Sequence, residues 1–210
     1  MKKAFIDYKI GSVLNTANNR ARTPETWYRI ISGIQKAGMG RLNIPILYGI
    51  DAIHGATYTA GATMFPQQIG QAATRNRELI KKGAEITAYE TRASGIPWNF
   101  SPVLDLGPDP RFPRIWETYG EDPYLTGQLG LKYVNGLQGN DEKYLKVIAT
   151  AKHYAVHSGP EPSRHQFNAQ TSDIDLYETY LPAFRTLVKE GHVYSVMGAY
   201  NRFRGESASA

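Results

Sequence analysis

The sequence contains no cysteine in its 210 residues. This absence excludes disulfide bonds, thiol catalysis and cysteine-ligated metals. Long hydrophobic runs are also absent, since none approaches the roughly 18 to 20 residues that span a bilayer. The first seven residues include Lys2 and Lys3, but no long apolar stretch follows them. Neither a membrane segment nor a signal peptide is therefore predicted.

Several familiar motifs are missing as well. Neither GxGxxG nor GxxxxGK[ST] occurs, which argues against a glycine-rich nucleotide-binding loop. There is no HExxH, EF-hand loop or compact histidine cluster, so no metal and no cofactor are predicted. The GxSxG motif that holds the nucleophile of many serine hydrolases is also absent, so a serine hydrolase is not predicted. The net charge is +5, but the lysines and arginines are scattered, so no nucleic-acid partner is predicted.

What the sequence has is an ordinary globular composition, 41% hydrophobic and 20% charged, with apolar runs that alternate with helical patterns. The runs that predict strands are 44–50, 97–104, 147–151 and 193–199, with a fifth at 10–14. The predicted helices are 24–37 after Thr23, one from Asn76 to about 93, 123–134 after Asp122, and 176–189 after Asp175. This alternation predicts one α/β domain over 1–210 with a parallel sheet.

Polar and often long loops follow the predicted strands, at 51–63, 105–121, 153–172 and from 201 onward. Functional residues in the loops after the strands are typical of the (β/α)8 TIM barrel. That barrel has eight strands, whereas this sequence predicts only four or five. We therefore expect an incomplete barrel, about the first two thirds of one.

Lys152 and His153 directly follow the predicted strand 147–151. Two titratable groups at the end of a buried strand are costly in a core, and they are suited to binding hydroxyl groups. An alternative use of Lys152 is a Schiff base with a carbonyl substrate, as in barrel aldolases, which requires a desolvated amine. Arg164 and His165 add donors in the same loop, and Tyr200 follows the last predicted strand.

Asp51 and His54 follow the strand 44–50. A carboxylate can accept hydrogen bonds from two neighbouring hydroxyls; the alternatives are that Asp51 caps a helix and that His54 is structural. In the next loop Arg114 and Glu117 are spaced to pair, which would make a rigid donor array. Trp116 and Tyr119 could supply an apolar wall, and Asp105 could tie its loop to its own backbone. The remaining polar groups are predicted to be solvated or to cap helices: Glu90, Arg111, Glu121, Asp122 and Glu178.

These segments resemble, in the same order, the N-terminal barrel domain of glycoside hydrolase family 3, the family of β-glucosidases and β-xylosidases. The resemblance covers roughly residues 10–210. The matching segments are YGIDAIHG at 48–55, FPQ at 65–67, SPVLD at 101–105, DPR at 109–111 with Arg114 and Glu117, KHY at 152–154, and VMGAYN at 196–201.

The resemblance implies an exo-acting enzyme that hydrolyses terminal β-glucosides or β-xylosides with retention, through a covalent intermediate on an Asp. It implies that the non-reducing sugar is bound by Asp51, Arg114, Lys152, His153 and Tyr200, with Arg164 and His165 reaching it from their loop. The family's nucleophile and acid/base are expected beyond Ala210, so no catalytic residue is predicted in this chain. One branch of the family uses a His of the Lys-His loop as acid/base, but the loop here fits the glucosidase and xylosidase branch.

We therefore predict a chain that binds β-glucoside or β-xyloside oligosaccharides without hydrolysing them. The alternative is a non-catalytic carbohydrate-binding or self-associating barrel fragment, because an incomplete barrel has two open sheet edges that a second copy could cover. Family members are often exported by bacteria that degrade plant polysaccharides, so the resemblance implies a periplasmic or secreted location for the parent enzyme.

Overall fold

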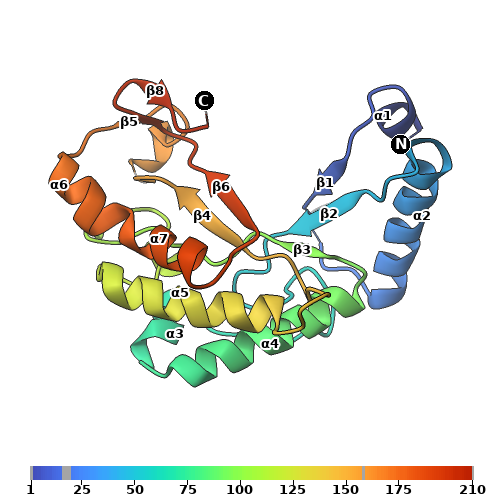
Figure 1. The fold of residues 1–210 in the computed structure, drawn as a ribbon, viewed down its shortest axis with the longest axis horizontal. Coiled ribbons are helices and arrows are strands. Elements are labelled where there is room, and N and C mark those ends of the chain that lie inside the picture. Colours follow the sequence, from blue (N-terminus) through green and yellow to red (C-terminus); the bar gives the residue numbers. More distant parts are fainter. Residues whose placement is uncertain (1, 16–19, 158, 210) are drawn as a thin grey trace.

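A computed structural model describes residues 2–15, 20–157 and 159–209. Five parallel strands lie side by side in chain order, β1, β2, β3, β4 and β6, with helices on one side of them (Figure 1). The strands are β1 (Ser12–Leu14), β2 (Leu47–Ile50), β3 (Trp98–Asn99), β4 (Thr150–Tyr154), β5 (Asn168–Ala169), β6 (Ser195–Gly198), β7 (Arg202–Phe203) and β8 (Glu206–Ser207). The helices are α1 (Lys2–Ile6), α2 (Pro24–Leu42), α3 (Gln68–Ala73), α4 (Arg77–Ala93), α5 (Pro123–Gln138), α6 (Asp173–Asp175) and α7 (Pro182–Lys189). Shorter turns are the 3-10 helices η2 (Ile115–Glu117) and η3 (Glu161–Ser163) and the π-helix η4 (Leu176–Tyr180).

The sheet is continuous from β1 to β6. Regular ladders join β1 to β2, β2 to β3, and β4 to β6. Between β3 and β4 the backbone bonds continue from Asn99 N to Ile148 O (2.9 Å) and from Leu104 N to Lys152 O (2.6 Å). Helices lie in the connections between successive strands, as parallel pairing requires. This is the strand–helix arrangement of the TIM barrel, as the sequence predicted.

Two hydrophobic clusters hold the helices against the strands. The larger is formed where α4 and α5 pack side by side beneath the sheet, together with α7 (Figure 1). The smaller surrounds Trp27 of α2, whose indole N–H donates to the carbonyl of Tyr58 (2.9 Å). None of the described helices has the length and apolar character needed to cross a bilayer.

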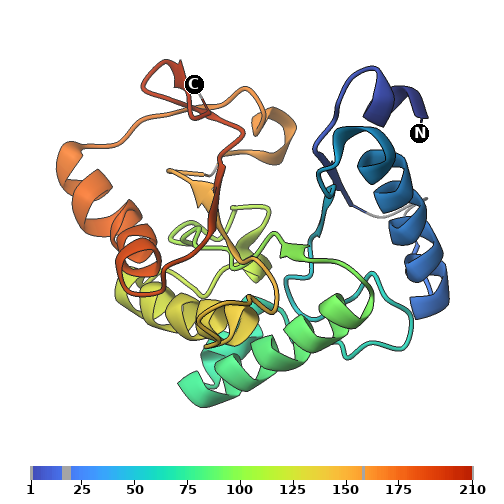
Figure 2. The ribbon, with the colours of Figure 1, turned by 45° about the vertical axis from the view of Figure 1, so that its right-hand side comes forward.

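A small second sheet lies over the strand ends. β5, in the loop after β4, pairs with β7, and β7 forms a hairpin with β8. Figure 2 shows this loop and the C-terminal hairpin together on one side of the molecule. The sequence analysis did not predict these three short strands, because two-residue strands have no detectable periodicity.

Three of the predicted helices need corrected boundaries, and the predicted strands 44–50, 97–104, 147–151 and 193–199 are observed as Leu47–Ile50, Trp98–Asn99, Thr150–Tyr154 and Ser195–Gly198. The helix predicted at 24–37 continues through Gly38 to Leu42. Gly38 does not end the helix; its lack of a side chain lets Ile46 pack closely against it. The helix predicted at 123–134 continues to Gln138, and Gly139, with φ 76°, forms its C-cap. The helix predicted at 176–189 starts earlier, at α6 with Ser172 rather than Asp175 as its N-cap, continues as η4, and is interrupted before α7, where Pro182 has no N–H to continue the helical bonding.

Candidate functional site

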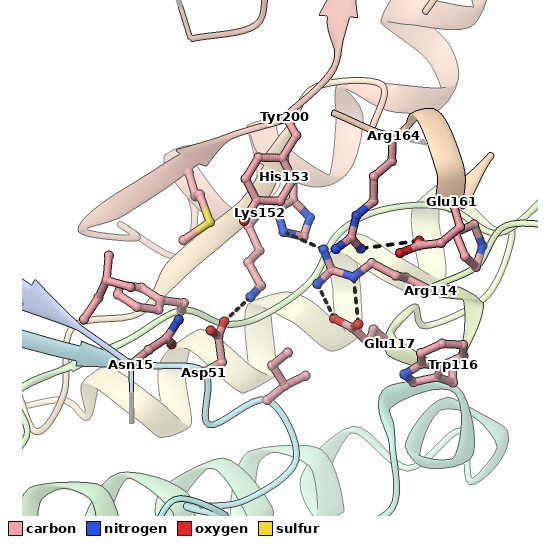
Figure 3. A pocket seen from close by; sticks show the side chains of 15 residues that line it. Asn15, Asp51, Arg114, Trp116, Glu117, Lys152, His153, Glu161, Arg164 and Tyr200 are labelled. Atoms are coloured by element: carbon pink, nitrogen blue, oxygen red, sulfur yellow. Dashed lines mark hydrogen bonds and ion pairs between the residues drawn. The ribbon is translucent and has the colours of Figure 1, made fainter. Parts of the chain in front are cut away.

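Side chains from the ends of the parallel strands meet around one cavity of about 690 Å³ (Figure 3). Asp51 follows β2, Lys152 and His153 belong to β4, and Tyr200 follows β6. Carboxyl ends of parallel strands lie at one face of a barrel, which is why residues far apart in sequence converge here. The lining residues are Leu14, Asn15, Asp51, Ile53, Phe100, Pro113, Arg114, Trp116, Glu117, Lys152, His153, Glu161, Arg164, Met197 and Tyr200.

Asp51 and Lys152 form an ion pair at the bottom of the cavity, with Lys152 Nζ 2.6 Å from Asp51 Oδ1. The Lys152 side chain is only 2% exposed, whereas Asp51 is 30% exposed and keeps a face toward the cavity. The Nζ of Lys152 is held by this carboxylate, whereas a Schiff base requires an amine that is free to attack a carbonyl. This ion pair therefore disfavours the aldolase alternative for Lys152. It also shows that Asp51 pairs with Lys152 rather than capping a helix.

Arg114 and Glu117 form the predicted pair, one turn apart at η2. Arg114 Nε lies 2.7 Å from Glu117 Oε1, and Nη2 binds the other carboxylate oxygen. Burial by itself lowers the pKa of Arg114, but the hydrogen bonds and charge of Glu117 outweigh it and raise that pKa. The two-point contact fixes the plane of the guanidinium, so Arg114 presents its third nitrogen, Nη1, in a defined direction.

Asp105 corrects a prediction. It does not tie its loop to its own backbone: Oδ1 accepts the backbone N–H of His153 (3.0 Å), and Oδ2 lies 2.8 Å from Nδ1 of both His153 and His157. Burial by itself would raise the pKa of Asp105, but the hydrogen bonds from the two histidines beside it lower it well below its usual range. The peptide bond before His153 is cis.

These three residues are also the compact histidine cluster that the sequence did not reveal. Asp105, His153 and His157 are all buried, and their potential ligand atoms lie within 4.8 Å of one another. Both Nδ1 atoms are already committed to hydrogen bonds with one carboxylate oxygen. The cluster is therefore a hydrogen-bonded triad.

The loop after β4 contributes Glu161 and Arg164, which pair at 3.5 Å at the edge of the cavity (Figure 3). His165 does not line the cavity; its ring lies against Tyr200, with the centroids 4.8 Å apart. The structure thus places six of the seven predicted residues around one cavity and the seventh behind Tyr200. That they bind sugar stays a prediction.

The other side chains singled out in the sequence have mixed outcomes. Tyr119 is buried in the core and supplies no wall, whereas Trp116 lines the cavity. Glu90 is partly exposed on its helix, and its carboxylate also accepts from the backbone N–H and the hydroxyl of Thr63. His54 is structural, with Nδ1 2.8 Å from the carbonyl oxygen of Phe65. Asp122 caps α5, as predicted.

Asn15 and Glu161 are cavity residues that the sequence analysis missed. Asn15 comes directly after β1, so its position at a strand end was an available signal. Glu161 lies in the middle of a long loop, where only the folded loop brings it to the cavity. Each carboxylate that lines the described cavity, Asp51, Glu117 and Glu161, is paired with a cation. This arrangement is suited to binding a neutral, hydroxyl-rich ligand.

The fold and the cavity define the class of this protein: an α/β barrel-type domain with a polar ligand site at the carboxyl ends of its strands. The chain belongs to glycosyl hydrolase family 3, since the model of that family's N-terminal domain matches residues 1–210.

Named relatives agree with this assignment. The chain is 44% identical over 171 residues to a xylan 1,4-beta-xylosidase from Xylanibacter ruminicola, covering 72% of this chain and 20% of that protein. It is 36% identical over 205 residues to the lysosomal beta glucosidase of Dictyostelium discoideum, covering 90% and 25%. The solved exo-1,3/1,4-beta-glucanase of a Pseudoalteromonas species superposes with a TM-score of 0.88 at 32% identity, covering 99% and 28%. The chain therefore spans about a quarter of the length of these relatives.

Proposed function

We propose that this domain binds the terminal non-reducing sugar of a β-glucoside or β-xyloside for a retaining exo-β-glycosidase. One observation carries the proposal: the Asp51–Lys152 and Arg114–Glu117 pairs face the same cavity. Because each charge is paired, the cavity offers fixed donors and acceptors without a net charge to neutralise. A sugar hydroxyl both donates and accepts, so it suits such an array.

The roles follow from the donor and acceptor chemistry of each side chain. The Asp51 carboxylate accepts hydrogen bonds from adjacent hydroxyls, and the Lys152 ammonium and Arg114 guanidinium donate to hydroxyl oxygens. Trp116 lines the cavity with an aromatic ring that can pack on the apolar face of a sugar. Both xylose and glucose carry the hydroxyl pattern that this set would recognise.

Hydrolysis itself is assigned to other parts of the parent enzyme. Retaining hydrolysis uses two carboxyl groups about 5 Å apart, one as nucleophile and one as acid and then base. The three carboxylates that line the described cavity are each engaged in an ion pair with a cation, which suits them to binding and positioning rather than to these two roles. The catalytic Asp and the acid/base are proposed to come from the remaining length of the enzyme, as the family resemblance implies.

Binding of two matched sugars tests the proposal. Methyl β-D-xylopyranoside and methyl β-D-glucopyranoside are titrated into the chain by calorimetry, and the preferred sugar shows which branch the enzyme follows. Asp51→Asn should weaken binding about tenfold or more, the effect of one charged hydrogen bond. Asp109→Asn is the matched control, because Asp109 pairs with Arg111 outside this cavity. Equal binding by the two variants would contradict the proposal.

A hydrolysis assay separates binding from catalysis. We expect no turnover of 4-nitrophenyl β-xyloside or β-glucoside by the purified chain. Retaining hydrolysis that survives Asp51→Ala would overturn both the role of Asp51 and the assignment of catalysis elsewhere. Sugar binding without hydrolysis would also fit the alternative of a non-catalytic carbohydrate-binding fragment, which the open edges of β1 and β6 favour.

A further inference from the structure

The buried triad beneath the cavity contains a histidine that the proposed sugar site does not use. His157 does not line the cavity, and its side chain is 1% exposed. Its ring lies 4.2 Å from the ring of His153, centroid to centroid, and edge-on to Phe112 at 6.0 Å. A buried imidazole costs free energy unless its polar atoms are used, and Nδ1 of His157 is used on Asp105.

Hydrogen-bond chemistry fixes the proton positions in the triad. An ionised carboxylate only accepts, so the 2.8 Å contact of Asp105 Oδ2 requires a proton on Nδ1 of His153. Arg114 only donates, so the 3.3 Å contact of its Nη1 requires a lone pair on Nε2 of His153. His153 is therefore neutral, with its proton on Nδ1. The same reasoning places a proton on Nδ1 of His157.

We infer that Asp105 and His157 are positioning residues that hold His153 as its neutral Nδ1–H tautomer, and that His153 in this form holds Arg114 through Nε2. Arg114 is then fixed from two sides, by Glu117 at Nε and Nη2 and by His153 at Nη1. His157 does not contact Arg114 and acts only through Asp105. Its Nδ1–H donates to the same Oδ2 that His153 contacts, and it thereby orients the carboxylate that fixes the tautomer of His153.

Protonation of His153 would break this chain of contacts. It would replace the lone pair on Nε2 with an N–H and set two cations against each other at Arg114. Burial lowers the pKa of His153, as do His157 and Lys152, while Asp105 raises it; the balance lies below the ordinary 6.5. The charged or titratable groups around His153 are Asp105, Arg114, Lys152, His157 and Tyr200, with Asp51 and Glu117 behind the two cations.

Imidazole nitrogen NMR of the ¹⁵N-labelled chain tests the inference without any sugar. Long-range ¹H–¹⁵N correlation spectra show which ring nitrogen carries the proton, and His153→Asn identifies the His153 signals. At pH 7 we expect Nδ1 of His153 in the protonated range and Nε2 in the unprotonated range. A protonated Nε2 at pH 7 would overturn the inference.

Two variants of His157 supply the matched comparison. His157→Phe keeps a ring beside Phe112 but removes the donor to Asp105, whereas His157→Asn keeps a short N–H donor that cannot become charged. With Phe, His153 loses one of the neighbours that lower its pKa, so its titration should move to higher pH. With Asn, the Nδ1–H tautomer should persist. An unchanged tautomer and titration in His157→Phe would show that His157 only fills space.

Asp105→Asn gives an independent result if the His157 variants do not fold. The amide N–H₂ can donate to Nδ1 of His153, which then moves its proton to Nε2 and faces Arg114 with a donor. We expect the opposite tautomer in this variant; retention of the Nδ1–H form would overturn the inference. Because these measurements use no ligand, their failure is distinct from a failure of the proposed sugar binding.

Discussion

At the scale of single residues, this site depends on how far each charge is removed from water. Lys152 is almost completely buried, and its partner Asp51 is partly solvated. Removing one partner of a buried pair costs more than the pair itself contributes, because a charge is left without compensation. The cost should therefore depend on which partner is removed.

Asp51→Asn should destabilise the fold more than Lys152→Met. The first leaves a buried ammonium beside a neutral amide, at a cost of about 3 kcal/mol. The second leaves a carboxylate that reaches the solvent of the cavity, at about 1 kcal/mol. Urea unfolding measures both free energies, and Asp109→Asn, which breaks the exposed and solvent-screened pair with Arg111, should change the free energy of unfolding much less than either. The reverse order of the two losses would show that Lys152 is not the more buried charge.

His153 makes stability depend on pH. Its pKa in the fold lies below the ordinary 6.5, so below pH 6.5 the unfolded chain binds protons that the folded chain does not. The free energy of unfolding should therefore fall as the pH drops from above 6.5 toward the lowered value, by at most about 1.4 kcal/mol per pH unit. Asp105, whose pKa is lowered from 3.8, adds a loss only at more acidic pH.

Urea unfolding at several pH values above and below 6.5 checks this dependence. His153→Gln should flatten the slope below pH 6.5, because glutamine does not titrate. A variant slope as steep as that of the original chain would assign the pH dependence to another group.

At the scale of helices and strands, close packing decides where glycine is required. A Cβ on Gly136 of α5 would lie 2.5 Å from the backbone oxygen of Lys81 and 2.7 Å from Cβ of Ala84, both in α4. Gly33 of α2 is also helical, but a Cβ there would meet nothing within 4 Å. The two positions form a matched pair in one molecule.

The same substitution should have opposite effects at these two positions. Gly136→Ala should destabilise by about 2 kcal/mol, because the contact is with backbone that must move. Gly33→Ala should stabilise by roughly 0.5 to 1 kcal/mol, since alanine restricts the unfolded chain and favours the helix. Thermal and urea unfolding of both variants measure the difference. A stabilising Gly136→Ala would show that α4 and α5 are not in close contact.

At the scale of the whole molecule, the described sheet has two open edges. Among the described residues, β1 pairs only with β2 and β6 only with β4. Apolar side chains are exposed on these edge strands: Leu14 at the end of β1 and Val196 on β6. Unpaired edges and exposed apolar side chains favour association with another chain.

We therefore expect the purified 210-residue chain to self-associate. Light scattering at micromolar concentration should give a mass above the 23.4 kDa of one chain. Val196→Lys places a charge at the edge of β6 and should shift the mass toward that of one chain. A single-chain mass for the original sequence would contradict the expectation.

Three of the four predicted helix starts are confirmed because their signals are local, whereas the fourth helix starts after Ser172 and not after Asp175. Asn76 accepts hydrogen bonds from the N–H groups of Glu78 and Leu79, and Asp122 does the same one helix later. Strand boundaries were less accurate: β4 begins at Thr150 and includes Lys152 and His153, beyond the apolar run 147–151. A strand ends where its neighbour's backbone stops pairing, and that depends on residues distant in sequence.

The sequence by itself determined the order of the five main strands and of the longer helices, the caps at Thr23, Asn76 and Asp122, and the polar residues that follow the strands, because each depends on neighbours a few residues away. Only the tertiary structure decided that Lys152 pairs with Asp51, that Asp105 holds two histidines, and that Tyr119 is core while Trp116 lines the cavity. Lys152 and Asp51 are separated by 101 positions in sequence. No local sequence pattern relates residues this far apart. The parallel strands bring them together because their carboxyl ends lie at one face of the barrel, and a buried charge there requires a partner of opposite charge.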